Sequence, residues 1–174
     1  MNRGFSLIEV LVATTLTTVA TVGLAQLAVM SARANHIARS SSLASALAAQ
    51  KIEQLRALAW TLDAAGNPVS DVVTDTAVVP ESPSGGTGLT DSPPGALTQD
   101  TAGYCDYIDG AGRSLGGPPL PAGAVFVRRW SIQSLAANET LLVQVSVTRV
   151  DARAGNRRAA GETRIVDVRT RRAP

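Results

Sequence analysis

The sequence has few of the residues that build large cores, disulfides or metal clusters. Only six of its 174 residues are Phe, Tyr or Trp, although hydrophobic residues make up 45%, so burial has to rest on Ala, Val and Leu. Cys105 is the only cysteine, which excludes an intramolecular disulfide and a cysteine-based metal cluster. The length allows one domain with an anchor rather than two full cores.

Signals of enzymatic chemistry are equally scarce. His36 is the only histidine, and without a nucleophile at readable spacing we interpret it as a polar residue at a membrane interface. The "GGTG" at 85–88 lacks the Gly-Lys-Ser/Thr of a phosphate loop, and Asp106 with Asp109 lacks the spacing of a calcium loop, so an ordinary turn is favoured there. Cys105 is interpreted as a small buried hydrophobe. The sequence predicts no catalytic residue, no metal site and no cofactor.

The charges are segregated along the chain, which the net charge of +2 hides. Residues 1–60 carry five basic and two acidic groups, residues 61–125 carry one and eight, and residues 126–174 carry ten and four. These blocks net +3, −7 and +6, so the basic C-terminal block is expected to be balanced by the acidic 61–125 segment or by a neighbouring subunit. A basic block of this kind also fits binding to nucleic acid phosphates.

A long uncharged run follows the N-terminus. The 23 residues from Val10 to Ala32 contain no Asp, Glu, Lys, Arg or His, and as a helix they would span about 34 Å, close to the hydrocarbon thickness of a bilayer. The threonines within the run can bond to the carbonyl one turn back, which limits their cost in lipid. A secretory signal peptide would have a shorter apolar core and a cleavage site after it. The run therefore predicts a membrane-spanning helix.

The helical pattern continues beyond this run. Apolar and small residues recur at intervals of three and four and predict one buried face, namely Ile37, Ser41, Ala44, Ala48, Ile52, Leu55, Ala59 and Leu62. No proline interrupts residues 5–65, and Gly66 with Pro68 supplies a stop signal. The sequence predicts one helix over 5–65, with a membrane-spanning part at 5–32 and an amphipathic part at 33–65.

The opening residues Gly4-Phe5-Ser6-Leu7-Ile8-Glu9-Val10-Leu11-Val12-Ala13 closely resemble the leader-peptidase site of type IV prepilins and type II secretion pseudopilins. The resemblance implies that a prepilin peptidase removes residues 1–4 after Gly4 and that Phe5 becomes the N-methylated terminus. It also implies that Glu9 pairs with the Phe5 amine of an adjacent subunit during filament assembly. The alternative is that Glu9 only reaches water at the edge of the bilayer.

The rest of the chain predicts an α+β fold of the type IV pilin kind, with the long helix packed on a C-terminal antiparallel sheet of three to four strands. Residues 66–124 are rich in Gly, Pro and Ser and are expected to form a variable loop with one short strand at 103–112. Within 125–174, three runs alternate with period two, from Phe126 to Ile132, from Leu141 to Val147, and from Ile165 to Val168.

These features predict a structural subunit, a minor pilin that is assembled into or primes a type IV pilus. One alternative is a pseudopilin of a type II secretion system. Another is a DNA-binding subunit of an uptake pilus, which would use Arg149, Arg153, Arg157, Arg158, Arg164, Arg169, Arg171 and Arg172. The resemblance implies prepilin peptidase, other pilins, an inner-membrane assembly platform and membrane lipid as partners, with nucleic acid as the weaker expectation. It places the chain as a single-pass inner-membrane protein with its C-terminal domain outside the cytoplasm.

Overall fold

The computed structural model describes residues 6–135, 139–150 and 162–171. The chain divides into two compact units, Met1–Arg39 and Ser40–Pro174. Helix α1 (Leu7–Ala57) begins in the first unit and ends in the second, so the two units are described separately.

In the first unit, every described residue from 6 to 39 is exposed. This part of α1 is apolar and contains the one helical stretch, among the described residues, that is long and apolar enough to cross a membrane. Large side chains such as Leu7, Leu16 and Leu24 are more than 60% exposed. Because nothing in the described chain covers these side chains, a lipid or protein environment has to do so.

The helix ends earlier than its sequence pattern predicts, at Ala57 instead of residue 65. The following residues form a two-stranded antiparallel sheet of β1 (Trp60–Leu62) and β2 (Pro68–Ser70). Between these strands Asp63 Oδ1 accepts hydrogen bonds from the amides of Ala65 and Asn67, and Gly66 has a φ of 82°. Gly66 therefore serves a hairpin turn and does not end the helix.

The main sheet of the second unit has five antiparallel strands in the order β4-β3-β5-β6-β7. They are β3 (Cys105–Ile108), β4 (Ser114–Gly116), β5 (Phe126–Leu135), β6 (Thr140–Arg149) and β7 (Thr163–Thr170). The three C-terminal strands were expected. The short strand β3 was also expected, but the structure adds β4 beside it, so the sheet exceeds the predicted three to four strands.

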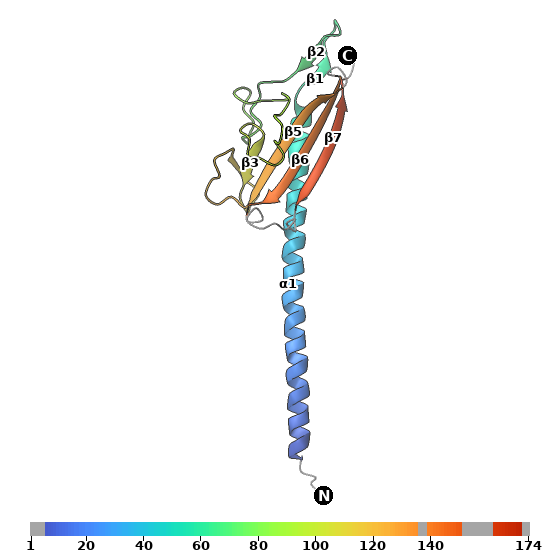
Figure 1. Cartoon of the computed structure of the whole chain (residues 1–174), viewed down its shortest axis with the longest axis vertical. Coiled ribbons are helices and arrows are strands. Elements are labelled where there is room, and N and C mark those ends of the chain that lie inside the picture. The colour runs from blue at the N-terminus through green and yellow to red at the C-terminus, as the bar shows by residue number, and fades with distance from the viewer. Residues whose placement is uncertain (1–5, 136–138, 151–161, 172–174) are drawn as a thin grey trace. The chain divides into compact units, whose positions relative to one another are not determined.

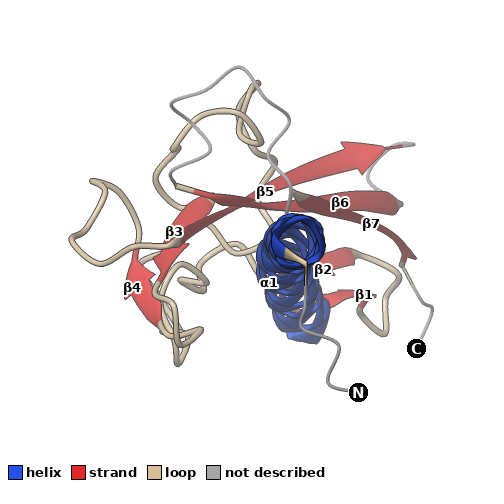
Figure 2. Ribbon diagram, turned by 90° about the horizontal axis from the view of Figure 1, so that it is seen from below, coloured by secondary structure: helices blue, strands red, loops and turns tan. Residues whose placement is uncertain are grey.

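The core lies between α1 and one face of this sheet (Figures 1 and 2). The helix contributes Ala44, Leu47, Ala48, Ile52 and Leu55, and the sheet contributes Ile108, Phe126, Trp130, Ile132, Leu141, Val143, Val145 and Val147. These sheet positions follow the predicted alternation of β5 and β6. The expected helical stripe was partly wrong, because Ile37 is 47% exposed while Leu47 and Lys51 are buried.

The segment between β2 and β3 has no long element of its own but is fixed to the domain by specific hydrogen bonds. Ser92 N donates to the carbonyl of Ile132 at 2.9 Å, and the hydroxyl of Tyr104 donates to the carbonyls of Thr90 and Asp91. Asp91 Oδ1 accepts from the amide and hydroxyl of Ser134 at 2.8 Å. This segment is therefore an ordered cover rather than a free linker.

Candidate functional site

Glu9 lies in the first turn of α1. The helix starts at the carbonyl of Ser6, which accepts from the amides of Glu9 and Val10 at 3.0 and 3.2 Å. A carboxylate at this end is favoured by the helix dipole. No side chain among the described residues binds the Glu9 carboxylate, and the predicted cleavage and methylation residues Gly4 and Phe5 lie outside the described residues.

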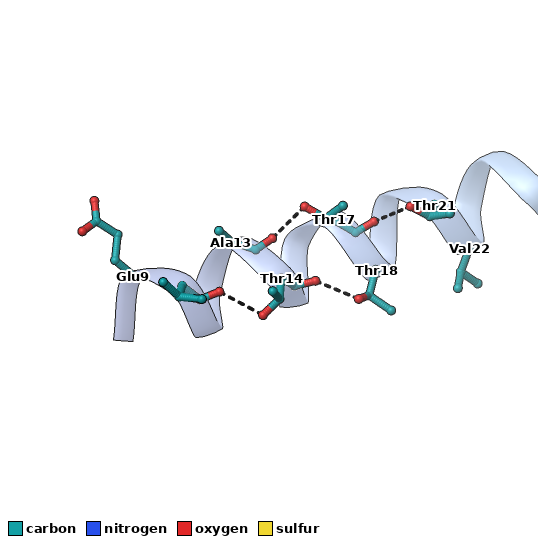
Figure 3. Close-up of a pocket in the computed structure, with 8 residues that line it drawn as sticks. Glu9, Ala13, Thr14, Thr17, Thr18, Thr21 and Val22 are labelled. Atoms are coloured by element: carbon teal, nitrogen blue, oxygen red, sulfur yellow. Dashed lines mark hydrogen bonds between the residues drawn. The ribbon is translucent and has the colours of Figure 1, made fainter. Parts of the chain in front are cut away.

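A groove of about 870 Å³ runs along the helix surface beside Glu9. Its lining consists of Glu9, Val10, Ala13, Thr14, Thr17, Thr18, Thr21 and Val22. Figure 3 shows Glu9 at one end of this row and Val22 at the other. These residues form two neighbouring rows along α1, and within each row the residues are four positions apart. Small side chains therefore form a continuous shallow surface next to one carboxylate.

The threonine hydroxyls in the groove are all satisfied within the helix. Thr14, Thr17, Thr18 and Thr21 donate to the carbonyls of residues 10, 13, 14 and 17 at 2.7 to 2.9 Å (Figure 3). Because these donors are used, the threonines present mainly methyl groups outward, and small residues of this kind let two helices in lipid approach closely. The groove can therefore seat an apolar helix, while Glu9 can bind a cation.

The second unit holds a buried charge cluster that the sequence did not reveal. The guanidinium of Arg128 in β5 donates to both carboxylate oxygens of Asp106 in β3, with Nε–Oδ1 at 3.0 Å and Nη2–Oδ2 at 2.6 Å. Arg128 Nη1 also donates to the carbonyl of Leu47 in α1 at 2.9 Å. Lys51 Nζ lies 3.8 Å from Asp106 Oδ2, and all three charged side chains are at most 1% exposed. The cluster ties two strands to the helix.

Lys51, the only lysine, also connects the helix to the segment before β3. Its Nζ donates to Gln54 Oε1 at 2.9 Å and also to the carbonyl of Thr76. The same nitrogen lies 3.8 Å from the centre of the Trp130 ring. Burial lowers the pKa of Lys51 to about 7, although the charge of Asp106 acts in the opposite direction. Two features of the sequence could have indicated the buried charge cluster, namely a lysine within the apolar helical face and a charged residue at a core-facing position of β5.

Several arginines of the basic C-terminal block are engaged inside the domain. Arg129 donates to Asp100 through Nε and Nη2 at 3.0 and 2.6 Å. Arg169 donates to the carbonyls of Leu55 and Leu58 at 3.0 and 3.2 Å, which satisfies acceptors at the end of α1. The Arg129–Asp100 pair, like the Arg128–Asp106 pair, matches the expected charge balance between the basic block and the acidic 61–125 segment.

The remaining arginines proposed for DNA binding fall into two groups. Arg171 stacks on Trp60 at 3.5 Å and donates to the carbonyls of Thr61 and Val69. Arg164 donates to Gln144, and Arg149 lies over the Phe126 ring. The other four arginines of the DNA hypothesis, at 153, 157, 158 and 172, lie outside the described residues.

The polar residues considered for chemistry have ordinary surroundings. Asp109 Oδ1 accepts from the amides of Ala111 and Arg113, which is the expected turn. Cys105 is fully buried, and burial raises the pKa of its thiol to about 12. His36 is exposed on α1. Among the described residues no group of three His, Cys, Asp or Glu side chains could hold a metal ion.

Comparison with known families finds one match, at the N-terminus. Residues 1–25 match the family model described as the prokaryotic N-terminal methylation motif, so the chain carries the prepilin-type signature. No curated protein and no solved structure matched the chain. The signature, together with the α+β pilin-like architecture, supports a protein of the type IV pilin and pseudopilin class that is anchored in a membrane.

Proposed function

We propose that the chain is a minor pilin, a structural subunit that prepilin peptidase cleaves between Gly4 and Phe5 and that is assembled into, or primes, a type IV pilus. The cleaved chain begins at Phe5, which is N-methylated, and Glu9 becomes its fifth residue. The chain crosses the inner membrane once, with residues 40–174 outside the cytoplasm, and an inner-membrane platform adds it to the fibre.

The observation that supports this proposal most directly is the combination of Glu9 with the adjoining groove. A carboxylate in a membrane helix is costly, up to about 2.5 to 3.5 kcal/mol at the helix centre and less toward its ends, and no described side chain neutralises Glu9. The new ammonium of Phe5 on a neighbouring subunit supplies the missing cation. The threonine-lined groove supplies a surface on which the neighbouring helix packs closely.

The test is replacement of Glu9 with Ala in cells that express the native assembly machinery. We expect normal removal of residues 1–4, because the peptidase cleaves the bond between Gly4 and Phe5, which lies before Glu9 in the chain. The amount of the variant recovered in sheared fibres should fall strongly. Glu53→Ala is the matched control, since Glu53 is an exposed glutamate on the same helix whose partner among the described residues is the exposed Arg56. Normal recovery of the Glu9→Ala chain in fibres would contradict the proposal.

Mass spectrometry of the mature protein tests the processing step independently. The expected N-terminus is a methylated Phe5. A protein that retains Met1 would remove the basis of the assignment. Recovery of the processed chain with secretion-system components in place of pilus components would reassign it as a pseudopilin.

A further inference from the structure

Three basic residues on α1 have no partner in the described chain. Arg33, His36 and Arg39 follow the apolar run directly, and all three are exposed. Every other arginine that the structure describes has a hydrogen-bond, ion-pair or ring partner. The helix carries no acidic residue between Glu9 and Glu53, so no carboxylate in this part of α1 neutralises the two guanidinium groups. We call these three residues the basic helix patch.

Helix geometry places this patch on the side of α1 opposite to Glu9. His36 follows Glu9 by 27 residues in one uninterrupted helix, which corresponds to about seven and a half turns and a rise of about 40 Å. Arg33 and Arg39 lie on opposite sides of His36, each about 60° from it around the helix axis, because each is three residues away from it. The patch is therefore centred half a turn from the carboxylate.

This relation has a definite consequence for packing between parallel helices. When a parallel neighbour is related to a helix by a shift without rotation about the helix axis, the two helices touch through opposite faces. Two residues that meet across such a contact must therefore differ by about half a turn in their positions around the helix axis. Glu9 and the patch satisfy this condition, and a shift of about 40 Å would bring them to the same height.

We propose that the basic helix patch binds the motif glutamate of another fibre subunit that carries the same methylation motif, shifted by about 40 Å along the helix axis. This inference rests on the proposed function, since it requires assembled subunits. The bound group is a carboxylate, and guanidinium groups are its strongest side-chain partners. The carboxylate has two oxygens, so it can accept from the patch and from an N-terminal ammonium together.

The proposal also gives the position of these arginines a reason. Arg33 and Arg39 lie on the far side of the apolar run, where the positive-inside tendency does not favour them in the orientation proposed above. In a fibre, the apolar part of one subunit lies beside the patch of another. When a subunit moves from the membrane into the fibre, its motif carboxylate then remains next to cationic side chains.

Site-specific photo-cross-linking in intact cells with assembled fibres tests the contact. Ala32→Cys carries the probe on the patch side, since Ala32 lies about 140° from Glu9 around the helix, whereas Ala34→Cys places it about 20° from Glu9. Both alanines are exposed, and the native Cys105 is buried, so a maleimide–diazirine reagent labels the engineered thiol. We expect only the Ala32 probe to cross-link to the N-terminal peptide that contains a motif glutamate. Equal yields from both positions, or no such peptide from Ala32, would overturn the proposal.

Neutralising the patch gives a second readout. The triple variant Arg33→Gln, His36→Gln, Arg39→Gln should be processed normally and should show about a two- to fivefold lower fraction in fibres, as expected for solvent-accessible ion pairs. Arg113→Gln, which removes an arginine that is 81% exposed in another part of the chain, should not change this fraction. Wild-type recovery of the triple variant overturns the inference alone, whereas absence of the wild-type chain from fibres overturns the proposed function.

Discussion

The buried charge cluster makes a sharp stability prediction for Asp106→Asn. The substitution is nearly isosteric, but it removes the only carboxylate within 4 Å of Arg128 and Lys51 among the described residues. The Arg128 guanidinium is then buried without a counter-charge, and Lys51 loses the charge that favours its protonated form. Breaking a buried ion pair by removing one partner costs about 3 to 5 kcal/mol, which is a large share of the 5 to 15 kcal/mol typical of a folded domain.

Tryptophan fluorescence provides the assay, because both tryptophans lie in the second unit. Trp60 is in β1, and Trp130 contacts Lys51 directly. Urea titration of the full chain in detergent micelles should therefore report the unfolding of residues 40–174. With an m-value of about 1 to 3 kcal/mol per molar, we expect the urea midpoint of Asp106→Asn to fall by more than about 1 M.

Asp109→Asn is the matched control. Asp109 is also an aspartate of the β3–β4 region, but its ionic partner Arg113 is 81% exposed, and an asparagine can keep the turn hydrogen bonds. The expected fall of the urea midpoint is small compared with that of Asp106→Asn, because a solvent-exposed ion pair contributes little to stability. Equal midpoints for the two variants would refute the reasoning, because the buried cluster would then stabilise the domain no more than a surface pair.

Three further predictions follow from the same geometry. Burial lowers the pKa of Lys51 to about 7 from 10.5, so above about pH 7 the unfolded chain binds more protons and stability should rise with pH, by up to about 1.4 kcal/mol per unit. The rise should extend to about pH 9, above which the raised pKa of Cys105 acts in the opposite direction, and urea titrations of Lys51→Met should lack it. The buried Cys105 thiol, whose pKa is raised to about 12, should resist iodoacetamide at pH 8 until urea unfolds the domain, and rapid alkylation of the folded chain would contradict its burial. Thr17→Leu should fill the groove and lower recovery in fibres by several fold, whereas Val19→Leu, on the other side of the helix, should not.

Local sequence patterns predicted the elements that dominate the fold. The period of three to four found the helix, and the alternation of Phe126, Trp130 and Ile132 found the core face of β5. The N-terminal motif was also readable, because its residues are consecutive. These signals depend on neighbours in sequence, so one sequence is enough to detect them.

The features that sequence analysis missed depend on contacts between distant residues. The end of α1 at Ala57 is set by the β1–β2 hairpin and by Arg169, which binds the last carbonyls from more than a hundred positions away. Strand β4 is only three residues long and becomes a strand by pairing with β3. Lys51 was not among the residues of the expected helical face, and its partner Asp106 could not be identified from spacing.

The two units differ in how their charges are satisfied, and this difference bears on function. In the second unit, described residues of the acidic middle segment and the basic C-terminal block neutralise each other through pairs such as Arg128–Asp106 and Arg129–Asp100. In the first unit, Glu9 and the basic helix patch lie on one helix with no described partner, half a turn and about 40 Å apart. A single straight helix cannot bring these opposite charges together. If the patch binds the motif glutamate as proposed, a second helix brings such charges together, and assembly completes the charge pairing of this part of the chain.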